Sequence, residues 1–180
     1  MINRTELNNK FSALQSSSIN CGGTWEIRVL AKSNLNDKAI SVLTDEFKKN
    51  GKYDNFELHK EFADKGGWNP EEQRLTQNLN LIALTNWENY FEQRIEHWSN
   101  FELISKDEMT LRFNKELFEE NKRKFKEDLH KYLEIKKLMM VYKIDENKFD
   151  TYDLWKEQIF EDFIFELESE ILTISFGWSS

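Results

Sequence analysis

The chain has 180 residues, of which 39% are hydrophobic, 14% aromatic and 32% charged, and its formal net charge is −8. That length suffices for one domain with a substantial core, and the aromatic content excludes an intrinsically disordered chain. The acidic balance disfavours unspecific binding to nucleic acid and favours a basic partner.

The N-terminal third predicts a helix, a strand and a second helix. Residues 5–17 form an amphipathic helix behind a Thr5 cap, with apolar side chains at i, i+4 and i+7: Leu7, Phe11 and Leu14. Residues 24–31 alternate apolar and polar side chains, which predicts a strand with Trp25, Ile27 and Val29 on one face. Residues 36–51 predict a helix from an Asn36 cap to Gly51, with Ile40, Leu43 and Phe47 at helical spacing.

The middle of the chain is expected to be mainly helical. Residues 52–68 fit either a loop or a short helix. Asn69 and Pro70 start a helix, and apolar residues keep a near-helical period to Trp98. This stretch is one long helix or two, the second capped by Thr85.

The C-terminal part mixes strands with helices. Residues 101–113 predict a hairpin, and residues 114–138 predict a helix with an inner side formed by Leu117, Phe118, Phe125, Leu129, Tyr132 and Leu133. Residues 139–144 are either the end of that helix or a strand. Residues 171–178 predict a strand with Leu172, Ile174, Phe176 and Trp178 on one face. No Pro-, Gly- or Ser-rich linker interrupts this order, so we expect a single α+β domain over residues 1–180. The simplest architecture is a small, mainly antiparallel sheet with about five helices packed on one face.

The chain lacks the spacings that usually hold metals or phosphates. Glu127 and His130 form one Glu-x-x-His step on a helix, but helical metal sites need a second such step, and a salt bridge on the helix surface is the better interpretation. Neither glycine pair has the spacing of a phosphate-binding loop. The basic residues in 122–126 are bracketed by carboxylates, which is typical of a solvated, salt-bridged helix face. We therefore expect no metal or cofactor and no enzymatic activity.

The cellular location follows from similar reasoning. Cys21 is the single cysteine, which excludes an internal disulfide and suits a reducing compartment. The N-terminal residues have no apolar run typical of a signal peptide, and no stretch is apolar enough to span a membrane. A cytoplasmic protein without membrane contact is expected.

The negative charge is concentrated near the C-terminus. Residues 144–180 carry ten acidic and two basic side chains, which equals the net charge of the whole chain. On a helix over residues 150–165, Asp150, Asp153, Glu157 and Glu161 would share one side, with Leu154 beside them. This is either an acidic solvent face or a binding surface in which an apolar anchor is flanked by steering charges. We take these five residues as the candidate partner-binding site.

An acidic, compact, aromatic-rich chain of this size is similar in general character to bacterial toxin-immunity proteins. That resemblance implies a stoichiometric inhibitor that binds a basic toxin or effector domain, often a nuclease, without contacting nucleic acid itself. Inhibitors of bacterial defence encoded by phages share this character. Two alternatives stay open: a small hydrolytic enzyme whose site is assembled only in the fold, and an acidic regulatory or assembly subunit.

Overall fold

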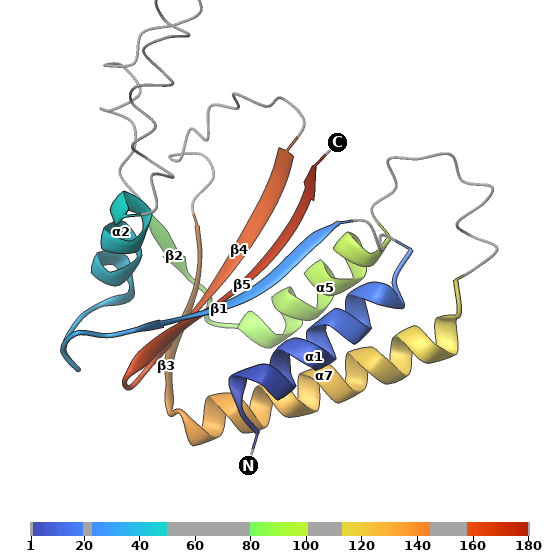
Figure 1. Ribbon diagram of the computed structural model, residues 1–180, viewed down its shortest axis with the longest axis horizontal. Helices are drawn as coiled ribbons and strands as arrows, with labels where there is room; N and C mark the ends of the chain where they lie inside the picture. Colours follow the sequence, from blue (N-terminus) through green and yellow to red (C-terminus); the bar gives the residue numbers. More distant parts are fainter. Residues whose placement is uncertain (1, 20–22, 50–79, 101–112, 145–157, 180) are drawn as a thin grey trace, which may run out of the picture.

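The computed structural model describes residues 2–19, 23–49, 80–100, 113–144 and 158–179 (Figure 1). Its helices are α1 (Arg4–Ser16), α2 (Ala39–Lys49), α5 (Trp87–Ser99) and α7 (Lys115–Ile135). Its strands are β1 (Thr24–Ala31), β2 (Leu81–Ala83), β3 (Leu138–Ile144), β4 (Gln158–Leu167) and β5 (Glu170–Ser179).

The strands form one five-stranded sheet in the order β1-β5-β4-β3-β2, and every neighbouring pair is antiparallel. The α+β class and the antiparallel sheet are therefore confirmed. Within the described ranges there are four helices, one fewer than the approximate number expected. None of these described helices is long and apolar enough to cross a membrane.

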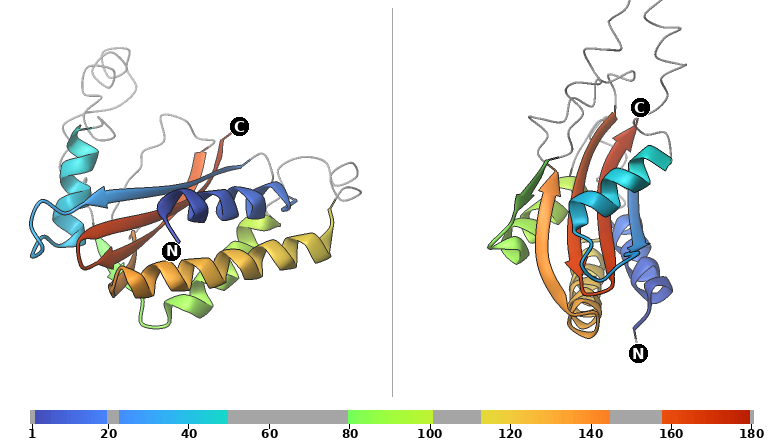
Figure 2. Two further views of the ribbon diagram at one scale, coloured as in Figure 1. Left: turned by 60° about the horizontal axis from the view of Figure 1, so that its bottom comes forward. Right: turned by 90° about the vertical axis from the view of Figure 1, so that its left-hand side faces the viewer.

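The helices cover both faces of the sheet, so the prediction of helices on one face is wrong. Helices α1, α5 and α7 share the larger core with one face, to which Phe163, Phe165 and Phe176 point. Helix α2 packs on the opposite face, where Ala39 and Leu43 meet Ile164 and Ile171 (Figures 1 and 2). The cause lies in the central strands: Phe163, Ile164 and Phe165 are all at most 1% exposed, and a strand buried on both sides needs cover on both sides.

The N-terminal predictions hold with changes at the helix starts. β1 covers the predicted residues, and Trp25, Ile27 and Val29 all pack toward the larger core. α1 is capped by Asn3 rather than Thr5, because Asn3 and Glu6 form a reciprocal capping box. In α2 the buried residues are Ala39 and Leu43, whereas Ile40 is 37% exposed. The side chain of Phe47 lies outside the described part.

The structure decides between the alternatives left open for two other segments. Leu81–Ala83 is a strand, so the helix after it is separate, and it begins after Asn86 rather than at Thr85. Residues 138–144 are a strand that pairs with β4. α7 is confirmed as a helix, but Leu117 is 47% exposed and does not belong to its inner side. The predictions for residues 52–68 and for the helix start at Pro70 lie outside the described residues. The same holds for the predicted hairpin over 101–113, apart from its last residue.

The largest correction concerns the acidic segment. Gln158–Leu167 is strand β4 rather than part of a helix. It pairs with β5 on one side and β3 on the other, and only Glu168 and Ser169 separate it from β5. Within the described part of β4, Phe163 and Phe165 point to the larger core, whereas Ile164 points to the opposite face.

Candidate functional site

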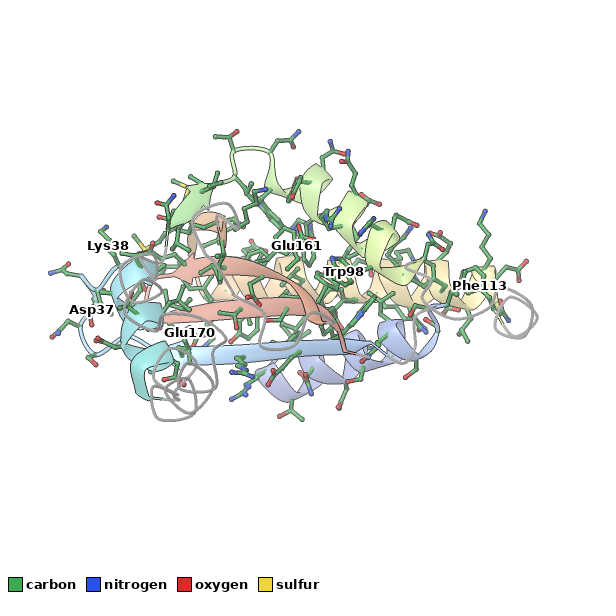
Figure 3. The ribbon with its side chains drawn as sticks, turned by 90° about the horizontal axis from the view of Figure 1, so that it is seen from above. Asp37, Lys38, Trp98, Phe113, Glu161 and Glu170 are labelled. Carbon is green, nitrogen blue, oxygen red and sulfur yellow. The ribbon has the colours of Figure 1, made fainter. Side chains whose placement is uncertain are left out.

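The most unusual polar group of the structure is Glu161, a carboxylate 5% exposed in the middle of the sheet. Three side chains of α5 donate hydrogen bonds to it. Tyr90 Oη lies 3.1 Å from Glu161 Oε1, Arg94 Nε 2.5 Å from Oε2, and Trp98 Nε1 2.8 Å from Oε2. Figure 3 shows Glu161 on β4 beside Trp98 on α5. We name Tyr90, Arg94, Trp98 and Glu161 the Glu161 cluster.

The spacing along α5 creates this arrangement. Tyr90, Arg94 and Trp98 follow one another every four residues, which places them on one side of the helix. Phe91 and Ile95, each one position further on, are buried in the larger core beside them. The apolar side chains thereby hold the three donors against β4.

A second cation borders the cluster. Lys143 Nζ on β3 lies 3.3 Å from Tyr90 Oη and 5.2 Å from the centroid of the Tyr90 ring. Burial, with help from the charge of Arg94, lowers the pKa of the neighbouring His97, although Glu161 acts in the opposite direction. Because Glu161 accepts hydrogen bonds from three donors, one of them a guanidinium, this carboxylate links α5 to the sheet.

The β4–β5 hairpin contains two more carboxylates of the same kind. Glu166 is 3% exposed, lies 3.2 Å from Lys32 Nζ and accepts from Tyr142 Oη at 3.1 Å. Glu170 accepts from Tyr132 Oη at 2.6 Å and lies 3.2 Å from Lys136 Nζ. Burial and these carboxylates raise the pKa of both Tyr132 and Tyr142. Both phenols therefore stay protonated donors at neutral pH.

Of the five predicted partner-binding residues, the structure describes Glu161 alone. Asp150, Asp153, Leu154 and Glu157 lie outside the described residues. Glu161 belongs to β4, and its burial does not fit an exposed steering charge. The error has a physical cause: the prediction counted charge along the segment, whereas the donors that neutralise Glu161 come from a helix 63 to 71 residues away in the sequence.

The sequence indicates the donors of the Glu161 cluster but not their acceptor. The four-residue spacing of Tyr90, Arg94 and Trp98 on a helix marks three donors on one face. Nothing in the local pattern identifies Glu161 as their acceptor.

The fold separates the charge of the chain into two parts. The described residues carry 19 acidic and 17 basic side chains, a net −2, whereas the residues outside them carry 14 acidic and 8 basic, a net −6. Half of that second excess belongs to residues 145–157, which have five carboxylates and two lysines. On the β4–β5 hairpin, Glu161, Glu166, Glu168 and Glu170 each form an ion pair with a cation from outside the hairpin. The acidic excess therefore belongs mainly to the connections.

The basic residues in 122–126 of α7 are engaged in ion pairs. Lys122 contacts Glu96 and Glu119, and Lys126 Nζ lies 2.7 Å from Glu92. Burial acts to lower the pKa of Lys122, but its hydrogen bonds to Glu119 and Glu96 outweigh burial and raise that pKa. The sequence predicted a solvated helix face here, but Lys122 is only 8% exposed.

The Glu-x-x-His step is split between two contacts. Glu127 pairs with Arg123 at 2.6 Å, and His130 Nδ1 lies 3.6 Å from Glu88. Among the described residues, no three His, Cys, Asp or Glu side chains are grouped so that they could hold a metal ion. His59 and Cys21 lie outside the described ranges.

Comparison of the chain with protein-family models, curated proteins and solved structures finds no significant match, so no family is assigned to it.

Proposed function

We propose that this protein is a stoichiometric inhibitor that binds and neutralises a basic toxin or effector domain, in the manner of a bacterial immunity protein. The observation that carries the proposal is the separation of charge between the nearly balanced described residues and the acidic connections. The four glutamates of the β4–β5 hairpin form internal ion pairs. The connections hold most of the net negative charge.

The sheet topology brings the attachment points of two acidic connections together. Residues 50–79 precede β2, and residues 145–157 follow β3. Leu81 pairs with Ile144 in the antiparallel register, so the first connection ends where the second begins. The two carry net charges of −2 and −3. Asp150, Asp153, Leu154 and Glu157 belong to the second connection and stay the candidate partner-binding residues.

Concentrated charge of one sign accelerates association with a partner of the opposite sign. Electrostatic steering raises association rates from about 10⁶ M⁻¹s⁻¹ to well above that value at low ionic strength. An apolar residue within such a surface, here Leu154, mainly slows dissociation. An inhibitor that must capture a toxin before it acts gains from both effects.

The decisive experiment is co-expression of the chain with the product of a neighbouring reading frame that encodes a basic, toxin-sized domain. We expect a complex of one copy of each protein, and restored growth of cells that the neighbour alone arrests. Binding without restored growth would instead favour an acidic regulatory or assembly subunit. Failure of the two proteins to co-purify would contradict the proposal for that pair.

A further inference from the structure

β1 is an edge strand of unusual regularity. It is eight residues long and occupies one end of the strand order. Its pairing with β5 runs from Thr24–Gly177 to Ala31–Glu170 without a shift in register. Among the described residues, β5 is its one hydrogen-bonded strand neighbour. Natural edge strands are usually shortened, bulged or interrupted by proline or lysine to prevent pairing with other chains, and β1 shows none of these features.

The backbone groups that face outward follow from the register. The Lys32 N–H donates to the Ser169 carbonyl oxygen directly opposite, at 3.1 Å. Hydrogen-bonded pairs alternate along an antiparallel ladder, so the even-numbered residues of β1 bond to β5. The odd-numbered residues Trp25, Ile27 and Val29 therefore direct their N–H and C=O groups toward the outer edge.

The side chains of β1 are complementary to a second, antiparallel copy of the same strand. If Ile27 lies opposite Ile27 of the second copy, Glu26 lies opposite Arg28 of the second copy, and Arg28 opposite its Glu26. Within one chain, Arg28 Nη2 lies 2.6 Å from Glu26 Oε2, and both side chains are partly exposed, at 44% for Glu26 and 38% for Arg28. Each can therefore also face its counterpart on the second copy. They share the sheet face opposite the larger core, and such directly opposed pairs of unlike charge stabilise a sheet.

We propose that two copies of the chain associate through antiparallel pairing of β1 with β1, centred on Ile27, which joins their sheets into one continuous sheet. In this register the odd-numbered residues supply the backbone hydrogen bonds, and the Glu26–Arg28 pairs fall at non-hydrogen-bonded positions, where side chains lie closest. This association is independent of the proposed inhibitory role.

Other registers that backbone polarity allows are less favourable. Those centred on Glu26 or on Arg28 would place two glutamates or two arginines directly opposite each other, and like charges at opposed positions destabilise a sheet. A register centred on Val29 would place Glu26 opposite Lys32 of the second copy. The side chain of Lys32 is 1% exposed and is already paired with Glu166, so this register would have to break a buried ion pair.

Helix α1 packs against the first half of β1. Its C-terminal half lies at the start of β1, where Gln15 donates to the Gly23 carbonyl oxygen and the Phe11 ring contacts the Trp25 ring at 5.4 Å. A two-fold axis through Ile27 places the α1 helices of the two copies at opposite ends of the paired strands.

The test is the mass of the full-length chain by analytical ultracentrifugation across a concentration series, at low and physiological salt. We expect a monomer–dimer equilibrium. Glu26→Arg places two arginines opposite each other at both positions and should raise the dimer dissociation constant about tenfold, since cross-strand charge pairs contribute roughly 0.2–1 kcal/mol each and two pairs are reversed. Arg28→Glu should do the same. An equimolar mixture of the two variants should form a heterodimer, because every opposed pair is again of unlike charge.

A backbone variant provides the second measurement. Val29→Pro removes an outward N–H without removing a bond to β5, and proline is tolerated at such edge positions. It should abolish the dimer, whereas Val29→Thr should keep it, with circular dichroism confirming that both are folded. A monomer at every concentration would overturn the proposal, as would a dimer that survives Val29→Pro. A chain that stays monomeric alone but loses a heterologous partner on Val29→Pro would assign this edge to another protein and would also overturn pairing with a second copy.

Discussion

Trp98 on α5 donates its indole N–H to Glu161 on β4 at 2.8 Å, and both side chains are buried. This contact joins a helix to the central part of the sheet. Arg94 and Tyr90 reach the same carboxylate from the same helix. The packing of α5 on the sheet therefore depends on a charged group as well as on Phe91 and Ile95.

The first prediction is that Glu161→Gln destabilises the fold by about 2 kcal/mol, because hydrogen bonds to a charged group are stronger than those to an amide and Arg94 loses its counter-ion. Urea unfolding measures the free energy. Glu168→Gln is the matched control, since that carboxylate is 52% exposed in its pair with Lys137 and its loss should change stability by less than about 0.5 kcal/mol. Equal losses in the two variants would show that the Glu161 cluster contributes nothing beyond a surface ion pair.

The buried Lys32–Glu166 pair should behave as a coupled unit. Lys32→Met leaves Glu166 charged and buried, and we expect a loss of about 3–5 kcal/mol. Adding Glu166→Gln removes the unpaired negative charge and keeps an acceptor for the Tyr142 hydroxyl. The double variant should therefore recover most of the lost stability. Thermal and urea unfolding of the two single variants and the double variant measure the coupling. Additive losses would contradict it.

Stability should fall at alkaline pH partly because of Tyr132. Its pKa in the folded protein is raised above the ordinary value of 10.0 by burial and by Glu170. The folded state therefore holds the phenolic proton more tightly than the unfolded chain, so this stabilisation is complete below pH 10 and is lost as the pH rises toward the folded pKa. Tyr132→Phe should be less stable than the parent at pH 8 by about 1 kcal/mol, and the gap should narrow above pH 10. Lysines titrate in both proteins, so the difference between them is the quantity to compare; a gap that stays constant with pH would contradict the assignment.

The acidic connection offers a test of steering. Asp153→Lys combined with Glu157→Lys should slow association with the cognate basic partner and flatten its salt dependence, while Leu154→Ala should mainly speed dissociation. Surface plasmon resonance at low and physiological salt separates the two rates. Glu168→Lys is the control, because Glu168 lies in the β4–β5 turn at the opposite end of the sheet from the β3–β4 connection. If the double reversal associates as fast as the parent, these carboxylates have no steering role.

A single domain over residues 1–180 also stays a prediction. We expect one cooperative unfolding transition with the same midpoint by circular dichroism and by tryptophan fluorescence. Limited proteolysis that releases two separately stable fragments would contradict it.

Local periodicity was a sufficient guide wherever an element is buried on one side only. β1 alternates with period two and α7 with the helical period, because each presents apolar side chains to the larger core and mainly polar side chains on its other face. The antiparallel sheet and the α+β class follow from such elements. A few boundary residues changed because a local hydrogen bond, such as the Asn3–Glu6 capping box, favoured one start over another.

The segment around Glu161 needed the tertiary structure. A strand covered on both faces has no apolar–polar alternation, so Phe163 and Ile164 fit the apolar side of a helix as well as a strand. Only pairing with β3 and β5 distinguishes the two. The surroundings of Glu161 are equally non-local: the sequence marks the residue as charged, but its burial depends on three donors from α5. A buried charge is stable only where hydrogen-bond donors or opposite charges lie beside it. Here those donors are brought to Glu161 by packing between elements that are distant in the chain.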